Sequence, residues 1–303
     1  MEEETTQLAP ALYLVATPIG NLGDITLRAL DVLRRAHRIA CEDTRQTQKL
    51  LNHFSITTPT VSCHQHNERS RAIELIADIK AGNPIAVVSD AGMPGISDPG
   101  SFLAAEAIAA GVPVIPIPGA NAALTALIAS GLPSSEFVFL GFLPEKAGAR
   151  RTRLEELAAE PHTSPRTLIF YEAPHRILDT LSDIEAVFGS MLHAVVAREL
   201  TKLHEEFLRG PVAEIRRDLA GRDRIRGEFV LLIEAPAGAP GLASETGEGT
   251  PQPRQSIATQ VARLQSEFAI DEKEALKRIA RSLGQSKSEV YRELQRERAK
   301  RKK

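Results

Sequence analysis

Short apolar runs alternate with longer amphipathic segments along the chain up to about residue 130. The runs are rich in β-branched residues, as buried strands are, and they cover residues 11–16, 38–41, 60–63, 85–89 and 112–117. Between them, apolar residues recur at helical spacing over 25–37, 44–54, 68–81 and 101–110. Gly82 and Gly111 directly follow the last two of these segments, where a glycine commonly ends a helix. The alternation predicts a mostly parallel sheet with helices on both faces.

The pattern changes near Phe137. Strand-like runs follow over 137–144, 167–176, 193–202, 205–210 and 228–235, with helical patterns over 151–159, 175–188 and 212–219. Fewer of these strands are separated by a full helix, which favours a mixed sheet. We therefore predict an α/β protein with an N-terminal domain at 1–135 and a second α/β domain at 136–235.

The remaining residues have a different composition. Residues 236–255 are mostly proline, glycine and small or polar residues, which cannot bury a core, so we predict a flexible linker there. Residues 256–303 are charged and helical in pattern. A Gly-Gln-Ser turn at 284–286 separates two helical segments, which is compatible with a helix-turn-helix.

Charge is unevenly distributed along the chain. Residues 271–303 hold twelve Lys and Arg against six Asp and Glu, a surplus of +6, which leaves the remainder at about −8 because the whole chain is −2. The C-terminal tail, 256–303, is therefore predicted to be basic as well as helical.

Membrane insertion and cysteine chemistry are not indicated. The chain has no apolar run of about eighteen residues, and its first residues, MEEETTQLAP, are acidic, so we expect neither a signal peptide nor a membrane span, and a cytoplasmic location. Cys41 and Cys63 lack C-x-x-C spacing and lie in predicted strands, which favours buried, reduced thiols over zinc binding or a disulfide.

Candidate binding loops follow the predicted strands of the first domain. In an open parallel sheet, ligands bind beyond the carboxyl ends of the strands, and the segments there are TPIGN, CEDTR, CHQHNE, SDAGMPGISDPG and PIPGAN. The glycine spacing of TPIGNLGD, starting at Thr17, fits neither a dinucleotide fingerprint nor a phosphate loop. SDAGMPGISDPG is longer than a turn needs and carries Asp90 and Asp98, whose carboxylates suit ribose hydroxyls or a cation. PIPGAN fits a ligand ring and a packed neighbouring helix equally well.

The sequence motifs favour neither a metal site nor a nucleophilic hydrolase. Cys63 and His64 would point in opposite directions at a strand end, so CHQHNE, which also contains His66, is not predicted to bind a metal; contact with substrate is the better interpretation. No G-x-S-x-G is present and Cys41 has no evident histidine partner, which argues against a hydrolase. A polar cleft is favoured by the charged residues grouped at strand ends in the second domain: Glu172, His175, Arg176, Arg198, Glu199 and Lys202.

A family resemblance rests on long motifs in one order. LVATPIGNLGDITLRAL, CEDTR, VVSDAGMPGISDPG, PGANAAL, SGLP, GFLP, IFYEAPHR, VARELTK and GEFVLLIE resemble the ribosomal RNA small subunit methyltransferase I family, part of the tetrapyrrole methylase superfamily. The similarity covers residues 11–235 and continues more weakly through the C-terminal helices. It implies two α/β domains with S-adenosylmethionine in the cleft between them, a homodimer, and 2'-O-ribose methylation of a decoding-centre cytidine in 16S rRNA of the 30S subunit.

The resemblance also implies which residues bind the cofactor. Pro18, Ile19 and Gly20 would lie at the mouth of the cleft. The pocket would be lined from the first domain by Asp90, Ala91, Gly92, Ile96, Asp98, Pro118, Gly119, Ala120, Asn121 and Ala122. The second domain would close it with Phe170, Tyr171, Arg198, Glu199 and Leu200. Met93 departs from the usual SDAGTP and lacks the hydroxyl of that threonine, and Ala173 stands where serine is frequent.

The expected chemistry needs alignment more than covalent help, because the methyl donor is an activated sulfonium. A base or a nearby cation would assist a ribose hydroxyl. Glu199 or Glu172 is the expected base, with Lys202, Arg198 or His175 as the cation, and no metal. Two alternatives stay open: a small-molecule, tetrapyrrole-like methylase on the same fold, which the basic tail disfavours, and a non-enzymatic RNA-binding assembly factor, which the intact glycine and aspartate loops disfavour.

Overall fold

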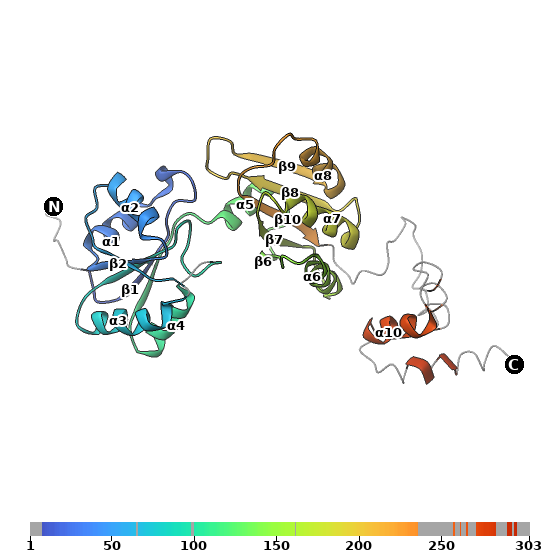
Figure 1. The fold of residues 1–303 in the computed structure, drawn as a ribbon, viewed down its shortest axis with the longest axis horizontal. Coiled ribbons are helices and arrows are strands. Elements are labelled where there is room, and N and C mark those ends of the chain that lie inside the picture. Colours follow the sequence, from blue (N-terminus) through green and yellow to red (C-terminus); the bar gives the residue numbers. More distant parts are fainter. Residues whose placement is uncertain are drawn as a thin grey trace. The chain divides into compact units, whose positions relative to one another are not determined.

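Two compact units make up the chain, residues 1–242 and 243–303. The computed structural model (Figure 1) describes residues 8–64, 66–97, 100–160 and 162–235, together with 257, 261, 265, 271–282, 290–292 and 294–295. The predicted linker, 236–255, and the predicted turn at 284–286 lie outside the described residues.

The first sheet is parallel. Its strands are β1 (Leu12–Val15), β2 (Arg38–Cys41), β3 (Thr60–Ser62), β4 (Ile85–Val88) and β5 (Val114–Ile117), in the order β3-β2-β4-β1-β5. All residues of β4 are buried, as expected for a strand covered on both faces. Because the strands run in one direction, the loops after them meet at one edge, as the sequence predicts.

Helices cover both faces of this sheet (Figure 1). They are α1 (Leu27–Arg35), α2 (Thr44–His53), α3 (Glu68–Lys80) and α4 (Ser101–Ala109), and a short 3-10 helix, η1 (Leu22–Asp24), precedes α1 and buries none of its residues. Tyr13 packs with α1 and α2 in one apolar cluster, whereas its neighbour Leu12 packs with α3 and α4 in another, because successive strand residues face opposite ways. Thr26 fixes the start of α1, since its hydroxyl accepts a hydrogen bond from the Ala29 amide at 3.0 Å.

The second sheet is mixed, which confirms the prediction. Its strands are β6 (Phe137–Phe142), β7 (Arg166–Glu172), β8 (His193–Arg198), β9 (Glu206–Pro211) and β10 (Phe229–Ala235), in the order β6-β7-β10-β8-β9. Only the β6–β7 pair is parallel among these described strands. The last strand along the chain, β10, thus lies in the middle of the sheet.

One face of the second sheet packs on α6 (Ala147–Ala159), α7 (Ile177–Phe188) and α8 (Val212–Ala220). The other face packs on α5 (Ala122–Ser130), which follows the last strand of the first sheet. The helices expected at 151–159 and 175–188 begin at 147 and 177, because helix boundaries are weakly encoded.

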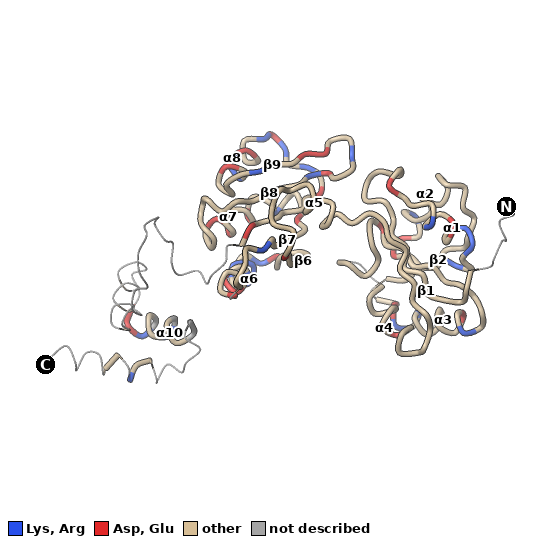
Figure 2. Tube along the Cα trace, turned by 180° about the vertical axis from the view of Figure 1, so that it is seen from behind, with Lys and Arg blue, Asp and Glu red and all other residues tan. Residues whose placement is uncertain are grey.

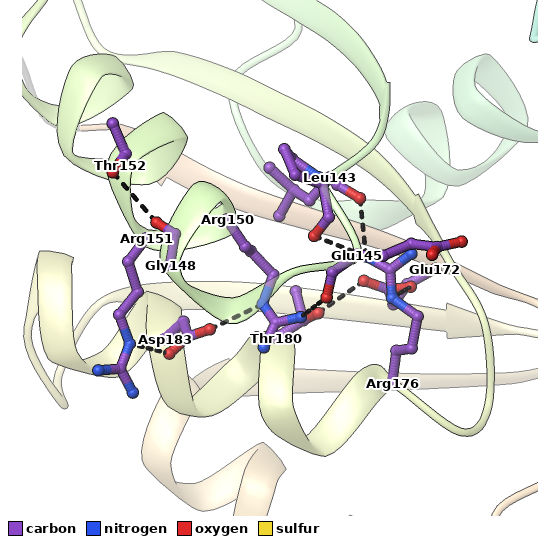
Figure 3. A network of polar contacts seen from close by, with 11 residues as sticks. Leu143, Glu145, Gly148, Arg150, Arg151, Thr152, Glu172, Arg176, Thr180 and Asp183 are labelled. Atoms are coloured by element: carbon purple, nitrogen blue, oxygen red, sulfur yellow. Dashed lines mark hydrogen bonds and ion pairs between the residues drawn. The ribbon is translucent and has the colours of Figure 1, made fainter.

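A buried ion pair joins α6 to α7 (Figure 3). Arg150 Nε and Asp183 Oδ2 are 2.7 Å apart, and the two residues are 4% and 2% exposed. Arg151 approaches the other carboxylate oxygen, and Arg150 also donates to the Glu145 carbonyl at 3.3 Å. Isolated buried charges are very costly, so this arrangement fixes how the two helices pack.

The C-terminal unit has a small apolar core of its own. α10 (Glu272–Ser282) contributes Ala275, Leu276, Ile279 and Ala280, which cluster with Ile257, Val261, Val290 and Leu294. The helical appendage predicted from the sequence is therefore confirmed where the structure describes it. Within that described part, none of the helices has both the length and the apolar character that crossing a membrane would require.

Candidate active site

The turn after β1 is fixed to the loop after β4. Thr17 and Gly92 exchange backbone hydrogen bonds, with the Thr17 amide donating to the Gly92 carbonyl at 2.9 Å and the Gly92 amide returning one at 3.1 Å. The Thr17 hydroxyl, which is buried, also donates to the Ser89 carbonyl at 3.1 Å. The TPIGN turn and the SDAGMP segment therefore form one rigid edge.

The loop after β5 packs closely on the end of β1. A Cβ on Gly119 would lie 2.8 Å from the Ala16 Cβ, nearer than real Cβ contacts come. Asn121 then caps α5, because its side-chain oxygen accepts a hydrogen bond from the Leu124 amide at 3.0 Å. Close packing and capping place the start of α5 beside the first two loops.

These loops and the second sheet enclose a cavity of about 360 Å³, within the range of small-molecule sites. Residues from both predicted domains line it. Those expected from the sequence are Ile19, Ala91, Gly92, Ile96, Asn121, Ala122, Tyr171, Glu172 and Leu200. The structure thus brings together residues that lie as far apart in sequence as Ile19 and Leu200.

Part of the cavity wall is aromatic. Tyr171 packs edge-on against Phe139, with ring centroids 4.9 Å apart, and against Phe142 at 5.8 Å. Phe142 and Tyr171 both line the cavity, and Phe142 is 56% exposed. A planar ring can stack or pack edge-on here.

Glu172 is buried at the cavity wall and its carboxylate is fully engaged (Figure 3). It accepts hydrogen bonds from the Thr180 hydroxyl at 2.6 Å and the Ala173 amide at 2.8 Å, and it lies 3.3 Å from Arg176 Nε. Arg176 in turn donates to the Leu143 carbonyl at 2.7 Å. These contacts hold the turn between β7 and α7 in place.

Lys202 lies across the TPIGN turn. A Cβ on Gly20 would be 2.5 Å from Lys202 Cγ, so the aliphatic part of the lysine rests on bare glycine backbone. The Lys202 ammonium donates to Glu199 Oε1 at 2.7 Å and Glu228 Oε2 at 2.9 Å. Glu199 and Thr201 have φ of 51° and 66°, a strained conformation for residues other than glycine.

Electrostatics keep this group charged. The hydrogen bond from Lys202 holds the pKa of Glu199 below its usual value, against the opposing effect of burial. Burial alone would lower the pKa of Lys202, but its hydrogen bonds to Glu199 and Glu228 outweigh it, and the pKa is raised. Acidic and basic segments also lie close together around β9 and α8 (Figure 2).

Several predicted residues lie outside the cavity lining, Glu199 and Lys202 among them, although Lys202 contacts the lining residue Glu228. Phe170 is fully buried in the core on the opposite face of β7 from Tyr171. Arg198 donates to the Arg226 carbonyl at 2.6 Å and pairs with Glu206 at 3.3 Å. His175 is exposed.

Other predicted residues support the loops. Asp90 is exposed and accepts a hydrogen bond from the Asp43 amide at 3.3 Å. Pro18 is buried next to Thr17, and Pro118 is exposed beside Gly119. The carbonyl oxygen of Ala120 lies 3.6 Å from where a Cβ on Gly92 would be. Asp98 lies outside the described residues.

Other residues that line the cavity were not expected there from the sequence: Met93, Ser97, Phe142, Ala173, Pro174, Glu228, Phe229 and Val230. Met93 and Ala173 stand out in the sequence only as departures from the family pattern. Phe229 and Val230 belong to an apolar run that indicates only a buried strand. Their place at the cavity follows from the insertion of β10 between β7 and β8.

Cys41 and Cys63 are free and buried, as predicted. Burial raises the pKa of both thiols, that of Cys63 to about 11, so neither is a ready nucleophile. Across the described ranges, His, Cys, Asp and Glu side chains do not gather in threes that could hold a metal ion.

Comparison with known proteins gives consistent matches. Residues 11–216 match the family of Tetrapyrrole (Corrin/Porphyrin) Methylases. The ribosomal RNA small subunit methyltransferase I of Halalkalibacterium halodurans is 49% identical over 282 residues, 92% of this chain and 93% of that protein. The protein of the same name from Vibrio cholerae is 53% identical over 226 residues, 74% of this chain and 77% of that one.

Solved structures agree in fold. A conserved hypothetical protein from Aeropyrum pernix K1 aligns with a TM-score of 0.55 at 22% identity, over 76% of this chain and 85% of that one. A uroporphyrin-III C-methyltransferase from Thermus thermophilus, complexed with S-adenyl homocysteine, aligns with a TM-score of 0.50 at 18% identity, over 74% and 96%.

Proposed function

Because the chain belongs to the ribosomal RNA small subunit methyltransferase I family of tetrapyrrole methylases, we propose that it transfers a methyl group from S-adenosylmethionine to ribosomal RNA. The observation that carries the proposal is 49% identity over nearly the full length of both chains. The finer proposal is that the acceptor is the 2'-oxygen of a decoding-centre cytidine in 16S rRNA, within the 30S subunit in the cytoplasm.

The cavity supports binding of S-adenosylmethionine. Its volume of about 360 Å³ suits a small cofactor. Tyr171 and Phe142 offer ring faces and edges for the adenine, while the backbone at Gly92 and the start of α5 at Ala122 allow close approach to the rest of the molecule. When bound, the cofactor supplies an electrophilic methyl group. The protein holds it in line with the acceptor and excludes water.

Lys202 is the residue we assign to the acceptor oxygen. Its ammonium lies at the TPIGN turn, where it can stabilise negative charge that develops on the ribose oxygen. Glu199 and Glu228 hold the ammonium in place. The lowered pKa of Glu199 makes it a weak base, so we assign it mainly to orienting Lys202.

The other proposed groups suit catalysis less well. Glu172 already accepts from Thr180 and the Ala173 amide, so its role is to hold the turn after β7. His175 is exposed, and Arg198 is engaged by the Arg226 carbonyl and by Glu206, so we assign neither to the chemistry.

The decisive experiment measures transfer of tritium from labelled S-adenosylmethionine into naked 16S rRNA and into assembled 30S particles. Label should appear in RNA and survive alkaline hydrolysis as a dinucleotide, because a 2'-O-methyl group blocks cleavage at that site. Binding of S-adenosylhomocysteine without RNA labelling would favour the small-molecule methylase. Absence of binding would favour the non-enzymatic assembly factor.

We propose that the basic C-terminal tail, residues 256–303, binds RNA phosphates. Its surplus of positive charge lies within residues 271–303. Deletion of 256–303 should weaken RNA binding and flatten its salt dependence while S-adenosylhomocysteine affinity stays constant. An unchanged salt slope would contradict this role.

A homodimer is also proposed from the family likeness. Leu124 and Ile128 on α5 are 46% and 82% exposed and lie four residues apart, so they share one helix face that can pair with a second copy. Ile128→Asp should shift sedimentation to that of a monomer. Ile73→Asp, at a residue of α3 that is 75% exposed, is the matched control and should leave sedimentation unchanged.

A further inference from the structure

The start of α4 lacks a cap of its own. Its N-cap residue is Gly100, which has no side chain to accept hydrogen bonds, and its first turn contains no acidic residue. The first amide groups of a helix need acceptors from outside the helix. The acceptors for α4 therefore come from water or from another part of the chain.

Glu68, the first residue of α3, supplies an acceptor. Its Oε1 accepts hydrogen bonds from the Gly100 amide at 3.0 Å and the Leu103 amide at 3.4 Å. The next residue, Arg69, places its guanidinium 5.9 Å from the centre of the Phe102 ring. The starts of α3 and α4 are thus clamped together, and the carboxylate suits the positive end of both helices.

The start of α4 supports the segment that lines the cavity. A Cβ on Gly100 would lie 3.4 Å from both the Gly95 amide nitrogen and the Pro94 Cβ, and one on Gly95 would lie 3.3 Å from the Ser101 amide nitrogen. Gly100 and Ser101, at the start of α4, therefore pack closely against residues 94–95. Their neighbours Met93, Ile96 and Ser97 line the cavity.

Ser97 needs such support. Its φ is 60°, which is unfavourable for a residue with a side chain, so surrounding contacts must maintain it. On its other side, the Ser97 hydroxyl lies 3.3 Å from where a Cβ on Gly141 of β6 would be. The segment 93–97 is held between α4 and the second sheet.

We infer that Glu68 is a positioning residue for the methyl donor: by fixing the start of α4 it keeps residues 93–97 in the shape that binds S-adenosylmethionine. The inference rests on the proposed function and adds a role for a residue that contacts neither donor nor acceptor. It also gives the CHQHNE segment a purpose other than contact with substrate.

The test compares Glu68→Ala and Glu68→Gln with Glu74→Ala. Glu74 is on the same helix and pairs with Arg38 and Arg71 but has no contact with α4 among the interactions of the described residues. Calorimetry should show S-adenosylhomocysteine binding about five- to tenfold weaker in Glu68→Ala, the equivalent of one lost helix cap. Glu68→Gln keeps an acceptor oxygen and should recover most of the affinity, while Glu74→Ala should match the wild type.

A second readout separates positioning from general stability. With saturating methyl donor, Glu68→Ala should keep kcat within about twofold of the wild type while its KM for the donor rises. If that variant does not fold, Glu68→Asp, whose carboxylate is one methylene shorter, replaces it with the same expectation. Equal affinities in Glu68→Ala, Glu74→Ala and the wild type would overturn the inference. Failure of the wild type to bind S-adenosylhomocysteine would overturn the proposed function instead.

Discussion

The contact between Gly20 and Lys202 predicts a strong, specific coupling between two residues 182 positions apart. A Cβ on Gly20 would lie 2.5 Å from Lys202 Cγ and 2.9 Å from Cε. Moving the lysine away would break the ammonium contacts to Glu199 and Glu228. Gly20 also has a φ of 156°, which side chains rarely adopt.

Two separate terms determine how much Gly20→Ala lowers the free energy of unfolding. Overpacking against Lys202 should cost about 1–3 kcal/mol, and the unfavourable φ adds about 1–3 kcal/mol. In a Lys202→Ala background the overpacking disappears and only the backbone term remains. The free energies of unfolding should therefore deviate from additivity by about 1–3 kcal/mol, with the double variant more stable than the sum of the single changes predicts.

Urea denaturation followed by circular dichroism measures this cycle in the wild type, both single variants and the double variant. Gly148→Ala on α6 is the matched control, because nothing lies within 4 Å of its added methyl group and alanine favours a helix. It should be additive with Lys202→Ala. Additivity of Gly20→Ala with Lys202→Ala to within about 0.5 kcal/mol would refute the contact.

Other predictions concern the ion pair between Arg150 and Asp183, the titration of Glu199, and ligand binding beside Tyr171. Asp183→Asn should lower the free energy of unfolding by about 3–5 kcal/mol, because it leaves the buried Arg150 guanidinium without a counter-ion. The double variant with Asp183→Leu and Arg150→Met should recover most of this lost stability. A double variant as unstable as Asp183→Asn would contradict the role of the ion pair. The lowered pKa of Glu199 contributes stability above about pH 4.3, the ordinary glutamate value, and this is lost as the pH falls through the lowered pKa. Acid unfolding of the wild type should therefore be steeper below about pH 4 than that of Lys202→Met, and identical slopes would argue against the pair. Tyr171→Ala should weaken S-adenosylhomocysteine binding about three- to tenfold through loss of the aromatic wall, whereas Tyr171→Phe should keep most of the affinity, as calorimetry can measure; unchanged affinity in the alanine variant would place the ligand elsewhere.

Much of the fold follows from local patterns in the sequence. The run at 85–89 is short, apolar and β-branched, and β4 is buried throughout. The helix expected at 68–81 appears as Glu68–Lys80 because apolar residues such as Leu75 and Ile79 recur on one face. Parallel strands then place the loops after them at one edge without further information.

Prediction of the site residues depended more on the family resemblance. A resemblance assigns a role to a whole motif and does not distinguish the residues on one face of a strand from those on the other. Phe170 and Tyr171 are neighbours on β7, so one enters the core and the other lines the cavity. Placing Val230 at the cavity requires the strand order of the second sheet, which no local sequence pattern specifies. The link from Glu68 to Gly100 joins residues 32 positions apart and has no sequence signal of its own.

The central place of β10 sets an order for folding during synthesis. The first sheet is complete once Ile117 has left the ribosome, and it can form while the rest of the chain is still being made. The second sheet cannot be completed before Phe229–Ala235 has been synthesised. β7 and β8 do not pair with each other, and β10 joins them by pairing with both. A nascent chain that stops before this strand exposes two unpaired strand edges and lacks Phe229 and Val230 in the wall of the cavity, so we expect a prematurely terminated product to be aggregation-prone and to have an incomplete cavity.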